Sequence, residues 1–178
     1  PLTPTDCLGS PYSSPSSFAL NPWFIDANEL KINSYIEDSE ILEKIRLEGL
    51  NTNLFKFKIA NELSNLIGDL LIKSWESQSA KSKKGFFIWL ENNPWVNDYS
   101  IFSVLKEQFN LLPWWQWPEE FRDKDKIKID LWKKDNSNKL LVKKLIQWHL
   151  HRQWLKIKKF AALKGVKLIG DIPFYVSR

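Results

Sequence analysis

Hydrophobic residues recur at intervals of three and four positions along most of this chain, a spacing that gathers side chains on one face of an α-helix. The pattern predicts four helices in the first two thirds of the chain, over residues 27–30, 39–47 and 61–77, and from Asn97 or Asp98 to Phe109. Ser39 is placed to cap the second of them. Because no strand pattern separates these helices, the middle of the chain is predicted to be an inserted helical subdomain.

The longest helix is predicted from about Asn138 to Lys164. Its inward-facing stripe consists of Val142, Ile146, Leu150, Trp154, Ile157 and Ala161. Gly165 is expected to end it, and the apolar run Val166–Asp171 that follows predicts a buried strand. A helix joined by so short a turn to a buried strand is typical of a parallel α/β unit.

Two features of the ends of this sequence bear on function. Residues 1–22 are rich in Pro, Ser and Gly and lack periodicity, which predicts a long functional loop. At the other end, Asp171 terminates the predicted strand, where parallel α/β folds carry their chemistry. From spacing alone, Asp171 is either an active-site carboxylate or the cap of a following turn.

Composition bounds the class of protein. The 178 residues begin with Pro1 and contain no methionine, so we expect a piece of a longer protein. A hydrophobic content of 43% is enough for a sizeable core. The single cysteine, Cys7, excludes an internal disulfide, and without a signal-peptide pattern the expected compartment is the cytoplasm. No apolar run is long enough to span a membrane.

The net charge of +5 raises the question of nucleic acid binding. The basic side chains are spread along the chain, however. They include Lys81, Lys83 and Lys84 in a predicted Ser-rich loop, and Lys143, Lys144, Lys156, Lys158 and Lys159 on the longest helix. Such dispersed charge favours a solvated surface over a nucleic acid interface.

Metal and cofactor sites are not predicted. The only histidines, His149 and His151, are two positions apart on a predicted helix and so point about 200° apart, which prevents them from sharing one metal ion. With one cysteine, a zinc site is unsupported, and the six glycines form no phosphate-binding motif.

Aromatic residues offer a sugar-binding alternative to core packing, because flat pyranose faces stack on aromatic rings. Among the ten tryptophans, three at helical spacing are predicted to be core: Trp75, Trp148 and Trp154. Three others lie on a loop between two prolines and could line a glucan groove: Trp114, Trp115 and Trp117. Tyr12 lies in a loop stiffened by prolines and flanked by hydroxyls, as a sugar platform requires, although an ordinary loop has the same pattern.

Four stretches of the chain carry motifs that follow one another in a specific order. The first is Pro1-Leu2-Thr3-Pro4-Thr5 with Ser10-Pro11-Tyr12, Phe18-Ala19, Asn21-Pro22 and Ile25-Asp26. Next come Asp98-Tyr99 with Phe102, and the Pro113-Trp114 to Trp117-Pro118 loop. The last is Gln153-Trp154 leading to Ile169-Gly170-Asp171-Ile172-Pro173-Phe174-Tyr175-Val176. In this order, the stretches resemble the 4-alpha-glucanotransferases known as amylomaltases or disproportionating enzymes, glycoside hydrolase family 77.

The resemblance implies part of an α/β fold, a (β/α)8 barrel interrupted by a mainly helical subdomain. Residues 1–30 would form the loop after the second strand, residues 31–137 the helical insertion, and residues 138–178 a barrel helix and the third strand. The chain would then be truncated at both ends. The first strand and strands four to eight are expected outside it.

The resemblance also implies a function and a site. Tyr12 would stack on the glucose ring at the donor subsite, Asp171 would hydrogen-bond there, and Ser10 would make a weaker contact. The nucleophile and the acid/base are expected beyond Arg178, so the fragment alone is expected to be inactive. The whole enzyme would transfer segments between α-1,4-glucans, with maltooligosaccharides as substrates, by a retaining double displacement without a cofactor. The alternatives are a hydrolase of the alpha-amylase group and a non-enzymatic helical module that binds glucan or nucleic acid.

Overall fold

A computed structural model describes residues 1–5, 9–10, 12–37, 39–50, 56–173 and 175–176. Cys7, Pro11 and Phe174, which belong to stretches singled out above, lie outside them. The helices are η1 (Pro22–Phe24), α1 (Ala27–Ile32), α2 (Glu40–Leu50), α3 (Phe57–Trp75), α4 (Ala80–Asn92), α5 (Trp95–Gln108), η2 (Trp114–Gln116), α6 (Glu119–Arg122), α7 (Lys126–Asp135) and α8 (Ser137–Leu163). The strands are β1 (Ser13–Ser14) and β2 (Tyr175–Val176).

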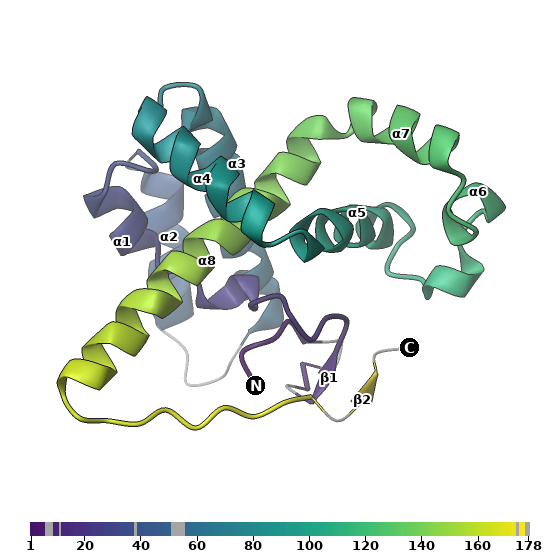
Figure 1. The fold of residues 1–178 in the computed structure, drawn as a ribbon. Coiled ribbons are helices and arrows are strands. Elements are labelled where there is room, and N and C mark those ends of the chain that lie inside the picture. Colours follow the sequence, from purple (N-terminus) through teal and green to yellow (C-terminus); the bar gives the residue numbers. More distant parts are fainter. Residues whose placement is uncertain (6–8, 11, 38, 51–55, 174, 177–178) are drawn as a thin grey trace.

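Helix α8 organises the fold. It packs against both α3 and α5, and it crosses the molecule with α1–α4 to one side and α5–α7 to the other (Figure 1). The main hydrophobic core lies where α8 meets α3, and buried members of it are Leu30, Leu42, Ile67, Leu71, Trp75, Phe86, Leu145, Ile146, Trp148 and Leu150. Burial of Trp75 and Trp148 confirms their prediction as core residues. Trp154 is only half-buried.

A second, smaller core lies under α5 and α7. Its buried residues are Val104, Leu105, Trp117, Trp132 and Leu140. Trp117 is therefore a packing residue, and its Nε1 donates a hydrogen bond to the Leu112 carbonyl over 3.0 Å. Trp114 and Trp115 remain 52% and 45% exposed. Of the three loop tryptophans, only these two are accessible to a ligand.

The end of α8 follows the predicted signal. Gly165 adopts φ +70°, a left-handed conformation that is costly for residues with a Cβ. The Val166 N–H donates to the Ala161 carbonyl over 2.9 Å and the Gly165 N–H to the Ala162 carbonyl over 3.0 Å. This pair of bonds satisfies carbonyls that the helix end leaves free. The prediction that Gly165 ends the helix is confirmed.

The predicted buried strand Val166–Asp171 is wrong for this structure. Residues 164–173 contain no strand, and Ile169 is 98% exposed. A strand requires a neighbour to accept its backbone hydrogen bonds, and the described residues offer this segment no neighbour before β2. The segment instead runs extended beneath the molecule until β2 reaches β1 (Figure 1).

Among the other predictions of local structure, the starts of two helices are confirmed and several details are wrong. The Asp26 carboxylate caps α1 and the Ser39 hydroxyl accepts from Leu42 N, so both helices begin where expected. The lysines predicted in a loop, Lys81, Lys83 and Lys84, lie in α4. Helices α4, α6 and α7 were not predicted, and α5 begins two residues before Asn97. Within the predicted stripe of α8, Ile157 is 54% exposed.

Candidate functional site

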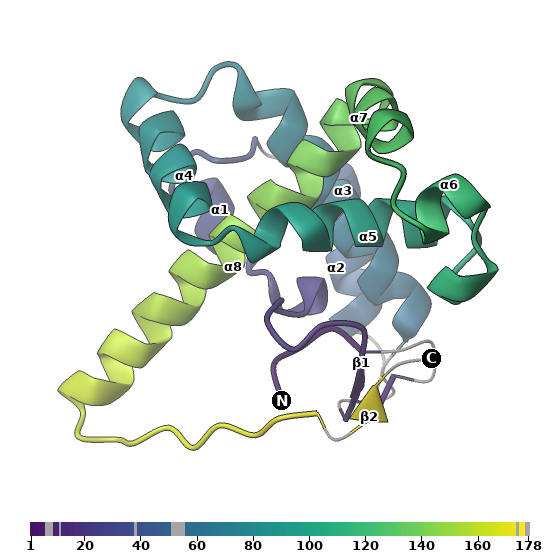
Figure 2. The same cartoon turned by 45° about the vertical axis from the view of Figure 1, so that its right-hand side comes forward.

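The structure places the two segments that bear the predicted sugar-binding residues next to each other. Strands β1 and β2 pair in parallel, with Ser13 opposite Tyr175 and Ser14 opposite Val176. Within this parallel pairing, the Tyr175 N–H donates to the Tyr12 carbonyl over 2.9 Å, which links the Tyr12 loop directly to β2. Figure 2 shows the two strands side by side near the N-terminus, as Figure 1 does from another angle. Residues separated by more than 160 positions are thus joined at one place.

Asp171 lies four residues before β2, within about 14 Å of Tyr175 along the chain. It is exposed, and its Oδ1 accepts a hydrogen bond from Ile172 N over 2.8 Å. No hydrogen bond to Oδ2 comes from the residues that the structure describes. The carboxylate therefore has acceptor capacity to offer a ligand at the β1–β2 junction.

Tyr12 and Ser10 lie on a loop that is folded by its own hydroxyl groups. The Ser10 Oγ accepts from Tyr12 N over 3.3 Å, and the Ser10 carbonyl accepts from Ser13 N over 3.3 Å. Further along, the Ser14 hydroxyl donates to the Ser16 carbonyl over 2.7 Å. Such local bonds fix turns without secondary structure. They leave the Tyr12 side chain 39% exposed, as a stacking platform must be.

Two buried glutamines on α8 hold the rest of this loop. The Gln147 side chain accepts from Leu20 N over 2.9 Å and donates to the Leu20 carbonyl over 2.8 Å. Gln153 repeats the arrangement at Asp26, accepting from its N–H over 2.9 Å and donating to its carbonyl over 3.0 Å. The two side chains are 2% and 8% exposed. Each amide satisfies both polar groups of one loop residue, so α8 fixes the loop at two points six residues apart.

Sequence reasoning did not assign this role to either glutamine, although Gln153 belongs to one of the stretches named above. The signal in the sequence that could have indicated this role is the position of Gln147 among apolar residues. Gln147 interrupts the buried run Leu145–Leu150, and a polar residue buried in such a run needs hydrogen-bond partners. The pattern could predict that partners exist, but not that they are the backbone of Leu20, 127 positions away.

We expect Gln147→Leu to lower the free energy of unfolding by about 2 kcal/mol, because it removes the side-chain partner of the part-buried N–H and carbonyl bonds of Leu20 while keeping the volume filled. Urea unfolding of the whole protein, followed by circular dichroism, measures this. Gln78→Leu is the matched control: the half-buried Gln78 side chain donates a single, exposed hydrogen bond to the Ser34 carbonyl, so its loss should cost less than half as much. Equal losses in the two variants would show that Gln147 does not hold the loop.

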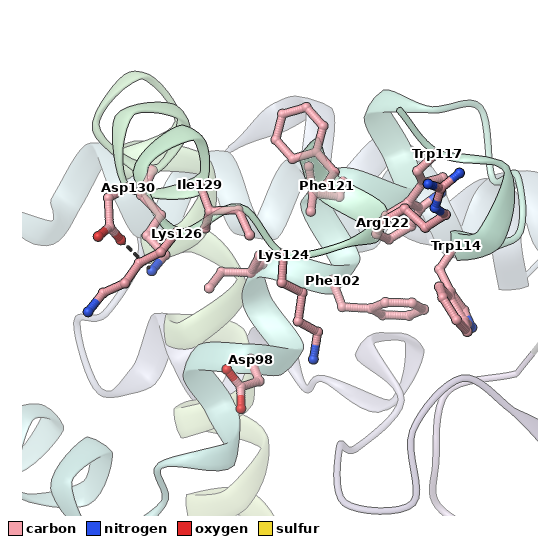
Figure 3. Close-up of a pocket in the computed structure, with 13 residues that line it drawn as sticks. Asp98, Phe102, Trp114, Trp117, Phe121, Arg122, Lys124, Lys126, Ile129 and Asp130 are labelled. Carbon is pink, nitrogen blue, oxygen red and sulfur yellow. Dashed lines mark hydrogen bonds and ion pairs between the residues drawn. The ribbon is translucent and has the colours of Figure 1, made fainter. Parts of the chain in front are cut away.

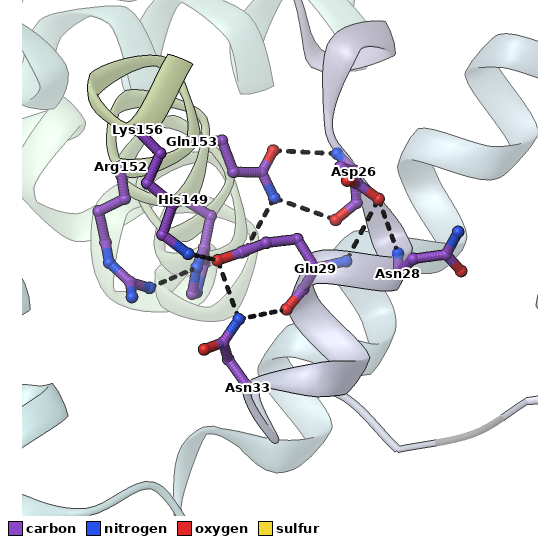
Figure 4. A network of polar contacts seen from close by, with 8 residues as sticks. All are labelled: Asp26, Asn28, Glu29, Asn33, His149, Arg152, Gln153 and Lys156. Carbon is purple, nitrogen blue, oxygen red and sulfur yellow. Dashed lines mark hydrogen bonds and ion pairs between the residues drawn. The ribbon is translucent and has the colours of Figure 1, made fainter. Parts of the chain in front are cut away.

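A polar network continues from Gln153 across the start of α1 (Figure 4). The Asp26 Oδ1 accepts from Asn28 N over 2.9 Å and from Glu29 N over 3.2 Å. The Glu29 carboxylate accepts from Gln153 over 3.1 Å and also contacts the Lys156 ammonium. The start of α1, which follows directly on the loop, is thereby tied to the middle of α8.

His149 lies beside this network but has a structural role. Its ring is 2% exposed, 4.5 Å from the Tyr35 ring, and its Nδ1 is 3.2 Å from Arg152 Nη1. Since a guanidinium can only donate, Nδ1 accepts, which places the proton on Nε2. Burial, reinforced by the positive charge of Arg152, lowers the pKa of His149 from its ordinary 6.5 to about 3. The histidine is therefore neutral throughout the physiological range.

This shift predicts acid sensitivity. Because the pKa of His149 is lower in the folded state than in the unfolded chain, the folded state binds fewer protons at acidic pH. The free energy of unfolding is therefore at its full value above about pH 6.5 and decreases as the pH falls toward 3. We expect wild type to lose about 2 kcal/mol more than His149→Gln between pH 7 and pH 5. Urea unfolding at the two pH values measures the difference. His151→Gln, at a half-buried ring on the same helix, should keep most of the wild-type loss, and parallel curves for wild type and His149→Gln would contradict the assignment.

No group of three or more His, Cys, Asp or Glu side chains among the described residues could hold a metal ion. No helix in the described part of the chain is both long enough and apolar enough to cross a membrane.

Comparison with known sequences relates the whole chain to a single protein family. The sequence model of a family described as 4-alpha-glucanotransferase matches residues 1–178. A 4-alpha-glucanotransferase of Clostridium butyricum is 30% identical over 179 residues, which cover 100% of this chain and 36% of that protein. One of Thermus thermophilus is 28% identical over 189 residues, covering 99% of this chain and 34% of that protein. The chain spans about a third of the length of these relatives.

Comparison with solved structures agrees. An amylomaltase from Streptococcus agalactiae, determined in complex with acarbose, superposes with a TM-score of 0.83 at 23% identity. The match covers 99% of this chain and 35% of that one. It shows that the mainly helical arrangement around α8, with its two short strands, is a fold that this amylomaltase shares.

Proposed function

Because this chain belongs to the 4-alpha-glucanotransferase family, glycoside hydrolase family 77, we propose that the whole protein transfers segments of α-1,4-glucan from one maltooligosaccharide to another. The observation that carries the proposal is the match of the family's sequence model to all 178 residues. The junction of the Tyr12 loop with the Asp171 segment supports it, because a sugar site needs both an aromatic face and hydrogen-bonding groups.

The place of the chain in the enzyme is part of the proposal. Residues 1–30 form the loop after the second strand of a (β/α)8 barrel, residues 31–137 a helical insertion, and residues 138–178 a barrel helix and the third strand. The exposed apolar side chains of Leu168 and Ile169 support this placement, since neighbouring barrel strands would cover them and supply the missing backbone partners. In the whole protein the extended segment 166–171 then becomes a strand that ends at Asp171.

In this enzyme Tyr12 stacks on the glucose ring of the donor and Asp171 accepts hydrogen bonds from its hydroxyls, with Ser10 making a further contact. The bond-breaking carboxylates follow Arg178. One attacks the anomeric carbon while the other protonates the departing glucan oxygen. The second then takes the proton of an acceptor 4-hydroxyl, which displaces the first and forms the new glycosidic bond. The residues of this chain hold the sugar, so the chain alone is expected to be inactive.

Incubation of the whole protein with maltotriose tests the function. Transfer releases glucose and produces chains longer than maltotriose. Hydrolysis without longer products would instead assign the protein to the alpha-amylase group. Unchanged maltotriose, with the protein still folded, would leave a binding module as the better description.

A further inference from the structure

A hollow on the described surface lies outside the Tyr12–Asp171 region. It is an open pocket of about 720 Å³ between α5, η2, α6 and α7. All of its lining residues fall between Asp98 and Lys133, so one continuous stretch builds it. Its volume is within the range of small-molecule sites. Figure 3 shows Lys124 extending into the same space as the ring of Phe102 and the carboxylate of Asp98, with Trp114 beyond Phe102.

The walls of this pocket rest on the second hydrophobic core. Phe102 packs on the buried Trp117 at 5.7 Å between ring centroids, and Trp117 packs in turn on Phe109 at 5.7 Å. On the other side, Phe121 contacts the buried Trp132 at 6.0 Å, and the Trp132 Nε1 donates to Gln108 over 2.8 Å. Because these rings are fixed from below, the pocket is formed before any ligand arrives, which lowers the entropic cost of binding.

The chemistry of the pocket suits a polyhydroxylated ligand. Trp114 offers a half-exposed indole, and Phe102 lies next to it as a second aromatic wall. Around them, Asp98, Lys124 and Lys126 have no ion-pair partner among the described residues, and they supply hydrogen-bond acceptors and donors. A flat apolar face ringed by such groups matches a pyranose, which has an apolar face and hydroxyls at its edge.

The charges argue against an anionic ligand. Lys133 is paired with Asp130 at 3.0 Å, and Arg122 is paired with Asp123 through two bonds of 2.8 and 3.0 Å. Of the cations in the pocket, Lys124 and Lys126 remain, and Asp98 faces the same space. The excess of positive charge is therefore small, whereas the aromatic surface is large.

We propose that this pocket is a second glucan-binding site, which holds a stretch of α-1,4-glucan through Trp114 while the Tyr12 loop and Asp171 hold the reacting end. The identity of the sugar rests on the proposed function, but the pocket itself does not. Such a site would favour long glucans, because a second contact on the same chain raises the effective concentration at the first.

Affinity electrophoresis of the whole protein in gels that contain soluble starch tests the proposal. We expect Trp114→Ala to weaken retention about fivefold or more, and Trp114→Phe to restore most of it. Trp115→Ala is the matched control, because Trp115 belongs to the same turn and is similarly exposed but does not line the pocket. The mobility of Trp115→Ala in these gels should equal that of the wild type. Circular dichroism melting of each variant verifies folding.

The remaining outcomes would each overturn the site. They are an unretained wild type, retention unchanged in Trp114→Ala, equal losses at Trp114 and Trp115, or retention abolished by inorganic phosphate, which would indicate an anion pocket. The maltotriose assay on the wild type separates this proposal from the proposed function. If the wild type transfers glucosyl units and Trp114→Ala leaves retention unchanged, only the second site is contradicted. If the wild type transfers nothing, the proposed function is contradicted.

Discussion

Asp171→Ala in the whole protein is expected to lower kcat/KM for transfer from maltotriose about 100-fold, because a carboxylate that accepts hydrogen bonds from sugar hydroxyls contributes strongly to binding the transition state. The structure supports this expectation in two ways. Asp171 is exposed beside the junction of β1 with β2, and its Oδ2 is not engaged by the described residues. Its removal should therefore affect sugar contacts and leave folding intact. Glucose release, measured with a coupled assay, reports the rate.

Asp171→Asn refines the test, since the amide keeps the size of the side chain but loses the charge and one acceptor. We expect it to fall between wild type and alanine, at about a tenfold loss. Asp69→Asn, at an exposed position on α3, is the matched control and should stay within about twofold of wild type. Wild-type transfer by Asp171→Ala, with an unchanged melting temperature, would remove this residue from the donor subsite.

What the sequence predicted well is determined by neighbours along the chain. The bounds of α8 lie within one residue of expectation at each end, because helical spacing and a left-handed glycine are local signals. The predicted cap at Ser39 is a local signal too. Where local signals were weak, prediction failed: α7 begins after Asp125 in a run of alternating lysines and isoleucines that is not helical in spacing.

What could not be predicted depends on contacts between distant residues. The run Val166–Asp171 has the composition of a strand, yet a strand exists only beside another strand, and the described residues supply none at that place. The opposite holds for the candidate site. The residue pattern alone did not bring Tyr12 and Asp171 together. The family resemblance implied that both belong to one donor subsite, and the pairing of Ser13 with Tyr175 brings their segments together in the structure. Likewise, nothing in the sequence pairs Gln147 with Leu20.

A glycine in the middle of α3 has a similar long-range explanation. Glycine normally weakens a helix, yet Gly68 is the twelfth of the nineteen residues of α3, so its presence there requires an explanation. A Cβ there would lie 2.7 Å from Val142 Cγ1 and 3.4 Å from Ile146 Cδ1, both on α8. The glycine therefore lets α3 and α8 approach closely at the main core. Since α8 holds the loop through Gln147 and Gln153, this approach also supports the candidate site.

We expect Gly68→Leu to lower the free energy of unfolding of the whole protein by about 3 kcal/mol or more, because four added carbons must fit between two packed helices whose facing valine has a stiff side chain. Gly85→Leu is the matched control. A Cβ at Gly85, in the interior of α4, lies 3.9 Å from its nearest neighbour, so the gain in helix propensity should leave stability equal or higher. Urea unfolding measures both variants.

The double variant shows whether the crowding arises at Val142. Gly68→Ala places a single methyl group against this side chain, and Val142→Ala removes the atom that it would meet. If the close approach is the reason for the glycine, the two substitutions together should destabilise by about 1 kcal/mol less than the sum of their separate effects. Additive losses would mean that α3 shifts away from α8 to accommodate the methyl group. Transfer activity would then report whether the loop held by Gln147 moves with it.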